Sequence, residues 1–200
     1  MLLRSTLTSP FGRKVRLAAT RLRLIERMRI EPADPLDAAD VLRHDNPLGK
    51  MPLLVLDDGR RLYDSRVILE HLDHLMGGGA LLPRDWESRF DALTQQALAD
   101  GIMDAAILVV YESRHRPKEI RHEPWLAYQG GKIERALDAF AAHPPDPEAF
   151  HVGTITLACA LGYLDWRKQV DWRSTHAALV AWLDRFRANV PEFDATKAES

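Results

Sequence analysis

The stretch NPLGKMPLLVLDDGRRLYDS, residues 46–65, decides the fold of the first part of the chain. It begins with a turn-rich loop that contains two prolines and continues directly into the apolar run of residues 53–56. Asp58-Gly59 favours a tight hairpin turn, so a second short strand should follow at residues 61–63. Asp64-Ser65 is typical of a helix start, and apolar residues recur at helical spacing beyond it. The stretch therefore predicts a β-hairpin followed by a helix.

Upstream of this stretch, short apolar runs alternate with helical patterns. A strand is expected around residues 2–7, and Ser9-Pro10 should open a helix with one apolar face. A second strand is predicted near residues 28–30 and a weaker helix over residues 35–46. Residues 1–77 are therefore expected to form a β-α-β-α-β-β-α domain, an α/β unit in which helices cover a sheet.

The rest of the chain shows helical patterns and no convincing strand. Glycines and Pro83 mark a linker at residues 78–83, and the all-helical domain after it should span residues 84–200. The apolar stripe of its first helix is predicted at Phe90, Leu93, Ala97 and Gly101. A later helix is apolar nearly all round, which predicts that it forms the buried centre of this domain. The expected helices lie at residues 85–114, 124–142, 154–168 and 177–189.

The composition narrows the classes of function. The 200 residues include 27 Lys and Arg against 29 Asp and Glu, a formal net charge of −2. Binders of nucleic acids or anionic membranes need a basic surface, so neither partner is expected. The longest uninterrupted apolar run, residues 105–111, is too short to cross a bilayer, and the N-terminus lacks a signal-peptide pattern. The single cysteine, Cys159, excludes a disulfide within the chain, and a cytoplasmic location is expected.

Three short clusters are candidates for chemistry. Ser9 lies where a strand should give way to a helix, beside the free N–H groups and positive dipole end that stabilise an anion. Met51-Pro52 is a candidate cis bond, which would free the Met51 main chain for an extended peptide. Asp64-Ser65 offers N–H groups and a hydroxyl to a carboxylate, and Asp64 can accept from an ammonium. Ser9 and Asp64-Ser65 also fit ordinary helix caps when each is taken alone. Together, the clusters suit a peptide that has a thiolate and a free α-carboxylate.

With these motifs the sequence resembles the glutathione S-transferase family over essentially its whole length. The resemblance rests on Ser-Pro-Phe at residues 9–11, Asn-Pro-Leu-Gly-Lys-Met-Pro at residues 46–52 and Asp-Ser at residues 64–65. Residues 97–104 and 158–165 are similar to the bacterial YibF-like members. The resemblance implies a thioredoxin-like first domain, an all-helical second domain, a homodimer, and glutathione as co-substrate.

The resemblance also implies a role for each matching residue. Ser9 would hydrogen-bond the glutathione sulfur, and the Met51 main chain would pair with the cysteinyl part. An acid of the long helix in this family often reaches glutathione bound to the other subunit, which here would be Asp100. The implied glutathione-binding residues are Ser9, Lys50, Met51, the cis proline Pro52, Asp64 and Ser65, with Asp100 contributed by the partner subunit.

The sequence departs from the family pattern at the start of the central helix. The usual Ser/Thr-x-x-Asp capping box is replaced by His151-Val152-Gly153-Thr154. We expect a weaker cap there, with Thr154 serving as the N-cap itself.

Three functions remain open on the sequence. The leading one is a transferase in which glutathione attacks a small electrophile, because Ser rather than Cys occupies position 9. The alternatives are a glutathione-dependent thiol or disulfide reductase and a non-catalytic glutathione-binding or regulatory module. No metal is expected, since His71 and His74 lie three residues apart without an evident third ligand.

Overall fold

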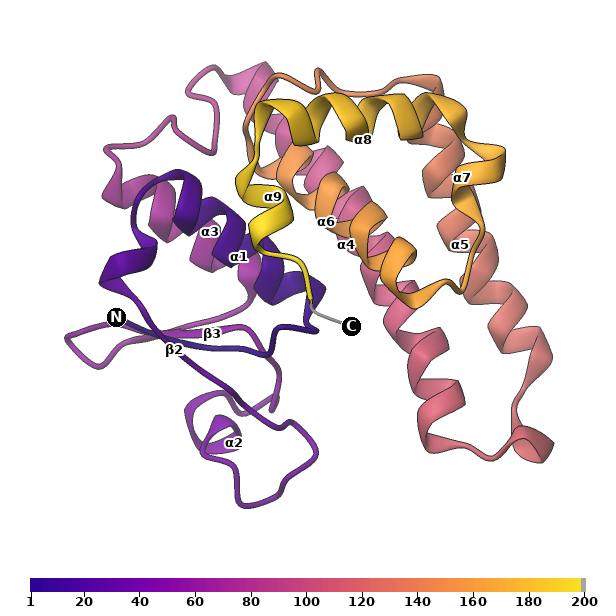
Figure 1. The fold of residues 1–200 in the computed structure, drawn as a ribbon. Helices are drawn as coiled ribbons and strands as arrows, with labels where there is room; N and C mark the ends of the chain where they lie inside the picture. The colour runs from indigo at the N-terminus through magenta and orange to yellow at the C-terminus, as the bar shows by residue number, and fades with distance from the viewer. Residues whose placement is uncertain (199–200) are drawn as a thin grey trace. The chain divides into compact units, whose positions relative to one another are not determined.

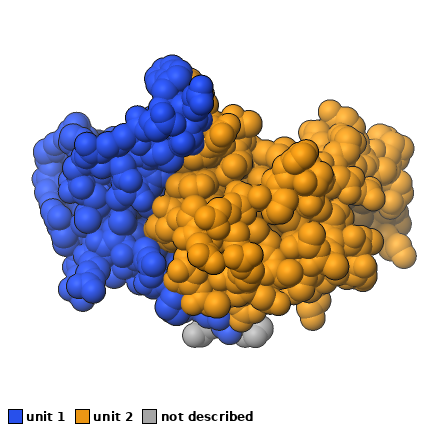
Figure 2. All heavy atoms as spheres, turned by 90° about the horizontal axis from the view of Figure 1, so that it is seen from above, with its two compact units in different colours: residues 1–89, 190–200 blue, residues 90–189 orange. Residues whose placement is uncertain are grey.

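The computed structural model describes residues 1–198. The chain divides into two compact units, coloured separately in Figure 2. The first unit comprises Met1–Arg89 together with the C-terminal segment that starts at Val190, and the second comprises Phe90–Asn189.

The first unit is built on a four-stranded sheet with the order β2-β1-β3-β4. Strand β1 pairs in parallel with β2 and antiparallel with β3, which pairs antiparallel with β4. Leu3, Leu53 and Leu54 of the two central strands are fully buried. The strand bounds are Leu2–Arg4 for β1, Arg29–Glu31 for β2, Leu53–Val55 for β3 and Arg61–Leu62 for β4.

Two helices cover one side of this sheet. Helix α1 spans Pro10–Arg21 and helix α3 spans Ser65–Leu75, and in Figure 1 both lie above the strands, with the short α2 on the opposite side. Ile68, Leu69 and Leu72 of α3 are fully buried. The order of elements is the one expected from the sequence, which confirms the thioredoxin-like α/β fold.

The predicted helix at residues 35–46 is wrong in length. Helix α2 covers only Leu42–Asp45, because aspartates upstream of it form turns instead. The side chains of Asp34 and Asp37 accept hydrogen bonds from the main-chain N–H groups two residues further on, at 2.9 and 2.8 Å. Such local bonds compete with the helical hydrogen-bond pattern. The first strand is also shorter than expected, and Leu7 is exposed.

The second unit consists of helices joined by loops, and α6 is its buried centre. Twelve residues of α6 are buried, Cys159 among them. The helices are α4 (Trp86–His115), which begins just before the unit boundary, η2 (Lys118–Ile120), α5 (Glu123–Ala142), α6 (Val152–Arg167), α7 (Trp172–Thr175) and α8 (Ala177–Asn189). The single-turn helices η1 (Ile25–Arg27), η2, α7 and α9 (Glu192–Ala195) were not predicted.

The predicted apolar stripe of α4 lies on the wrong side of the helix. Phe90 is 48% exposed, Ala97 and Gly101 are exposed, and Leu93 is only half-buried. Because α4 carries small and apolar residues on both sides, its periodicity does not select one face. The buried side instead consists of residues three or four apart, namely Ala92, Gln96, Ala99, Met103, Ala106 and Val110.

The expected cap of α6 is also corrected. His151, not Thr154, is the N-cap, and its Nδ1 accepts a hydrogen bond from the Gly153 N–H at 3.1 Å. The Thr154 hydroxyl accepts from the His151 N–H at 3.1 Å, which completes a capping box. Burial lowers the pKa of His151 more than nearby Asp146 raises it, so the ring stays neutral and its Nδ1 stays an acceptor.

Asp73 fixes the glycine-rich segment predicted as a linker. Its Oδ1 accepts from the Leu81 N–H at 2.6 Å and from the Leu82 N–H at 3.4 Å, and its Oδ2 accepts from the Gly79 N–H at 3.1 Å. Gly77, Gly78 and Gly79 all have φ between 78° and 88°, which side chains disfavour. Residues 77–82 are therefore bound to the end of α3.

The C-terminal segment belongs to the first compact unit, not to the helical domain 84–200 expected from the sequence. Arg13 donates to the Phe193 carbonyl at 2.8 Å, and its guanidinium lies 4.0 Å from the centre of the Phe193 ring. Arg16 donates to the Thr196 carbonyl at 3.3 Å. Two arginines of α1 thus hold α9 and the residues after it.

Helix α4 is long and apolar enough to cross a membrane by length and composition alone. The apolar window has a mean hydropathy of 1.3, and 44% of it is buried within the chain. Core helices of soluble proteins meet the same criterion, so this property does not assign α4 to a membrane.

Candidate functional site

The register of the sheet brings the three predicted clusters to one end of it. Arg4 pairs with Leu53, so the residues after β1 and the residues before β3 lie at the same end. Leu54 pairs with Leu62 in antiparallel fashion, so the chain that leaves β4 towards Asp64 emerges there as well. Ser9, Met51-Pro52 and Asp64-Ser65 therefore lie at the same end of the sheet. In many open α/β sheets, ligands bind beyond the carboxyl ends of the strands, and β1 and β4 both end here.

Ser9 is the N-cap of α1. Its Oγ accepts a hydrogen bond from the Gly12 N–H at 3.1 Å, and Pro10 fills the first helical position. Because the hydroxyl uses a lone pair for this bond, its proton stays available for a second acceptor. The capping interpretation and the catalytic interpretation of Ser9 are therefore compatible.

Arg16 holds the loop that carries Ser9. Its guanidinium donates to the Thr6 carbonyl at 2.9 Å and to the Leu7 carbonyl at 3.2 Å, and the residue is only 4% exposed. Sequence reasoning did not select Arg16. The available signal was a basic residue in a helix segment whose neighbours, such as Val15, are apolar.

The Met51-Pro52 peptide bond is cis. The Thr6 N–H contacts the Met51 sulfur at 3.3 Å, which joins this cluster to the Ser9 loop. Asn46, 1% exposed, shapes the preceding loop by donating to the Lys50 carbonyl at 2.7 Å. Within residues 1–198, the main-chain N–H and C=O of Met51 make no hydrogen bond, and the Lys50 side chain is exposed. The Met51 main chain can therefore pair with an extended peptide.

Asp64 and Ser65 begin helix α3. Asp64 is the N-cap, and its Oδ1 accepts from the Arg66 N–H at 2.9 Å. Its Oδ2 lies 3.8 Å from the Arg66 Nε, and the side chain is 60% exposed, so it stays accessible to a further cation. Ser65 is 2% exposed, and its hydroxyl has no hydrogen-bond partner in the part of the chain that the structure describes. A buried hydroxyl at the positive end of a helix is suited to an anion.

Asp100 does not join these clusters within the first unit. It lies on α4 in the second unit and is 1% exposed, whereas Asp104, one turn further on, is exposed. The role of Asp100 towards a partner subunit stays a prediction.

The described residues contain no group of three or more His, Cys, Asp or Glu side chains that could hold a metal ion. The rings of His71 and His74 lie 6.5 Å apart, centre to centre.

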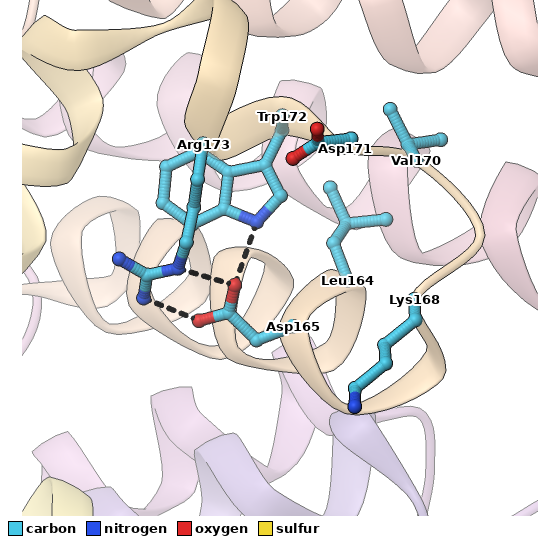
Figure 3. Close-up of a pocket in the computed structure, with 7 residues that line it drawn as sticks. All are labelled: Leu164, Asp165, Lys168, Val170, Asp171, Trp172 and Arg173. Atoms are coloured by element: carbon cyan, nitrogen blue, oxygen red, sulfur yellow. Dashed lines mark hydrogen bonds and ion pairs between the residues drawn. The ribbon is translucent and has the colours of Figure 1, made fainter.

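A hollow that sequence reasoning missed lies after α6, with a volume of about 420 Å³ (Figure 3). Asp165 dominates its polar side, accepting from Trp172 Nε1 at 2.9 Å and from Arg173 Nε and Nη2 at 2.8 and 2.6 Å. These bonds satisfy the Asp165 carboxylate and engage the Arg173 guanidinium within the chain. Its lining residues are Leu164, Asp165, Lys168, Val170, Asp171, Trp172 and Arg173.

The fold and the site define a thioredoxin-like protein. At one end of its sheet, the first unit presents the N-termini of α1 and α3 and the main-chain N–H and C=O groups of Met51, which are unpaired in the described part of the chain. Comparison with known proteins gives the family. The sequence model for the glutathione S-transferase N-terminal domain matches residues 3–79. The chain is 36% identical to the uncharacterized GST-like protein YibF of Escherichia coli (strain K12) over 167 residues, which cover 80% of each chain. It therefore belongs to the glutathione S-transferase family.

Solved structures agree with this assignment. A glutathione transferase family member from Pseudomonas fluorescens Pf-5, crystallised with bound glutathione, is 40% identical and has a TM-score of 0.93. That match covers 100% of this chain and 99% of the other. A second structure from the same organism contains S-(propanoic acid)-glutathione, with 40% identity, a TM-score of 0.89 and full coverage of both chains.

Proposed function

We propose that this chain is a glutathione transferase that binds glutathione in its first unit and stabilises the glutathione thiolate with Ser9. The observation that carries the proposal is the convergence of Ser9, Met51 and Ser65 at one end of the sheet. The relatives crystallised with glutathione and with an S-substituted glutathione support it.

The chemistry follows from the groups in the site. An ordinary thiol has a pKa near ~8.5, and a helix N-terminus with a hydroxyl donor lowers the pKa of a thiol bound there. The thiolate sulfur then forms a bond to an electrophilic carbon of the second substrate. In a substitution, the bond to the leaving group breaks and the group departs with its electron pair. In an addition, the π bond between the attacked carbon and its neighbour breaks, and the neighbouring carbon keeps the electron pair and takes up a proton from water.

The other candidate residues would each bind a different part of glutathione. The main chain of Met51, next to Lys50 and Pro52, would pair with the cysteinyl residue. Ser65 and the α3 N-terminus would bind the γ-glutamyl carboxylate, and the exposed Asp64 carboxylate would accept from its ammonium. A cytoplasmic location fits a chain whose single cysteine, Cys159, is buried.

Replacing Ser65 by alanine should weaken glutathione binding by about 1–3 kcal/mol, because a hydroxyl that bonds a carboxylate is removed from a buried position. Isothermal titration calorimetry of the full chain measures the change, with the exposed Ser88→Ala as control. Equal affinity of wild type and Ser65→Ala would remove Ser65 from the site.

We also propose a homodimer, in which Asp100 of one subunit reaches the glutathione of the other. The exposed side of α4 offers apolar surface for such contact, since Trp86 is 69% and Phe90 is 48% exposed one turn apart. Large exposed apolar side chains that cluster in this way are typical of interfaces.

Sedimentation at micromolar concentration should show a species of twice the 22.7 kDa chain mass. Phe90→Glu should shift it towards the monomer, because a charge would be buried at the interface. Ile120→Glu, at a side chain that is 63% exposed in η2, should leave the mass unchanged. A wild-type chain that sediments only as 22.7 kDa would contradict both the dimer and the role of Asp100 across it.

A further inference from the structure

The last turns of α4 and α6 bring together a set of aromatic and basic side chains that the glutathione site does not use. Tyr111 and Arg114 belong to α4, and Tyr163, Trp166 and Arg167 belong to α6. In Figure 1 these two helices follow similar directions within the second unit, and the Ala92 carbonyl of α4 closely approaches Gly153 of α6. The five residues are called the arginine–tyrosine cluster below.

The guanidinium groups of the cluster lie over its rings, and that of Arg167 stacks on Trp166. The Arg167 guanidinium lies 3.7 Å from the centre of the Trp166 ring and 5.5 Å from that of Tyr163. The Arg114 guanidinium lies 5.9 Å from the centre of the Tyr111 ring. Stacking of this kind holds a guanidinium flat and leaves the N–H groups at its edge able to donate.

Neither arginine of the cluster has a carboxylate partner within residues 1–198. The neighbouring arginines differ in this respect, since Arg116 pairs with Glu112 at 3.1 Å and Arg173 with Asp165 at 2.6 Å. The Arg167 Nε is buried and makes no hydrogen bond. A buried donor without an acceptor is costly, so an anion that accepts from the Arg167 guanidinium would stabilise this end of α6.

The phenol of Tyr163 adds a neutral donor to the two cations. Tyr163 is 5% exposed, and burial raises the pKa of its phenol more than the nearby Arg167 and Arg114 charges lower it. The hydroxyl therefore keeps its proton at neutral pH and can donate to a carboxylate oxygen. The aromatic rings around it give a planar ligand a surface on which to stack.

We propose that the arginine–tyrosine cluster binds small planar carboxylates, with Arg114 and Arg167 holding the carboxylate and the aromatic rings holding the planar body. A guanidinium matches a carboxylate with two parallel hydrogen bonds, which a neutral amide of the same shape cannot reproduce.

The test is calorimetric titration of the full chain with benzoate and with its neutral counterpart benzamide. Benzoate should bind and benzamide should bind at least about tenfold more weakly, because hydrogen bonds to a charged group are the stronger ones. Arg114→Gln and Arg167→Gln should each lower the affinity for benzoate about tenfold and leave that for benzamide unchanged. Arg167→Lys, which keeps the charge, should lie between the wild type and Arg167→Gln.

Arg185→Gln, at an exposed arginine of α8, is the matched control and should bind benzoate as the wild type does. Thermal melting of each variant checks that it is folded. Equal affinity for benzoate and benzamide, or unchanged benzoate affinity in Arg114→Gln and Arg167→Gln, would overturn the proposal. A glutathione titration of the same protein distinguishes the carboxylate site from the proposed transferase function. Glutathione binding without benzoate binding would refute only the carboxylate site. Benzoate binding without glutathione binding would refute only the transferase function.

Discussion

Asp73→Ala should lower the free energy of unfolding by about 3–5 kcal/mol, because it leaves the N–H groups of residues 79, 81 and 82 without their acceptor. Leu81 and Leu82 are buried, so water does not easily replace the carboxylate there. Asp73→Asn keeps one acceptor oxygen but turns an NH₂ group towards an N–H donor, and its loss should be smaller.

Denaturant unfolding measures these changes. Asp91→Ala, at an exposed aspartate of α4, is the matched control and should shift the free energy of unfolding by no more than about 0.5 kcal/mol. A loss below about 1 kcal/mol for Asp73→Ala would show that the glycine-rich segment does not depend on this anchor.

Ser9→Ala should raise the pKa of the thiol of bound glutathione by about one to two units. The hydroxyl proton is the donor lost, a hydrogen bond to a charged group contributes about 1.5–3 kcal/mol, and each pKa unit corresponds to about 1.4 kcal/mol. The α1 N-terminus remains, so part of the pKa shift and most of the glutathione affinity should persist. The turnover defect should be largest well below the thiol pKa and should vanish at high pH, where the unassisted thiol also ionises.

Ultraviolet titration of the enzyme-bound thiolate measures this pKa, with the exposed Ser88→Ala as control. Ser9→Cys should gain disulfide-exchange activity and lose transferase activity, because the new thiol forms a mixed disulfide with glutathione. Identical titration curves for wild type and Ser9→Ala would reduce Ser9 to a helix cap and make Thr8 the next hydroxyl to examine.

The order of strands and helices in the first unit could be predicted because its signals are local. The Asp58-Gly59 turn, the Ser9-Pro10 start and the Asp64-Ser65 start each specify a boundary from neighbouring residues. Where several local solutions compete, the prediction failed. The aspartates of residues 34–40 favour turns over a helix, and α4 is apolar on both sides, so only tertiary packing selects its buried face.

The candidate site residues also divide into those specified by a local motif and those that depend on tertiary packing. Ser9, Met51 and Ser65 could be selected because they lie in recognisable motifs, and sheet register then brings them together. Arg16 and the arginine–tyrosine cluster carry no motif. The roles of these side chains depend on the carbonyl groups and rings that they contact. Those contacts cannot be read from the sequence, because they form only when the chain packs into its tertiary structure.

The return of the C-terminal segment to the first unit has a consequence for engineering. The helical unit is in effect an insertion, entered near Arg89 and left near Val190, so the thioredoxin-like unit is discontinuous in sequence. A fragment that ends at residue 89 would lack α9 and would leave Arg13 without the Phe193 carbonyl. Chimeras that exchange helical units between relatives therefore need two matched junctions. A tag fused after α9 would follow closely on Thr196, whose carbonyl accepts a hydrogen bond from Arg16. Because Arg16 also donates to the Thr6 carbonyl in the loop that carries Ser9, such a tag would be close to a contact that supports this loop.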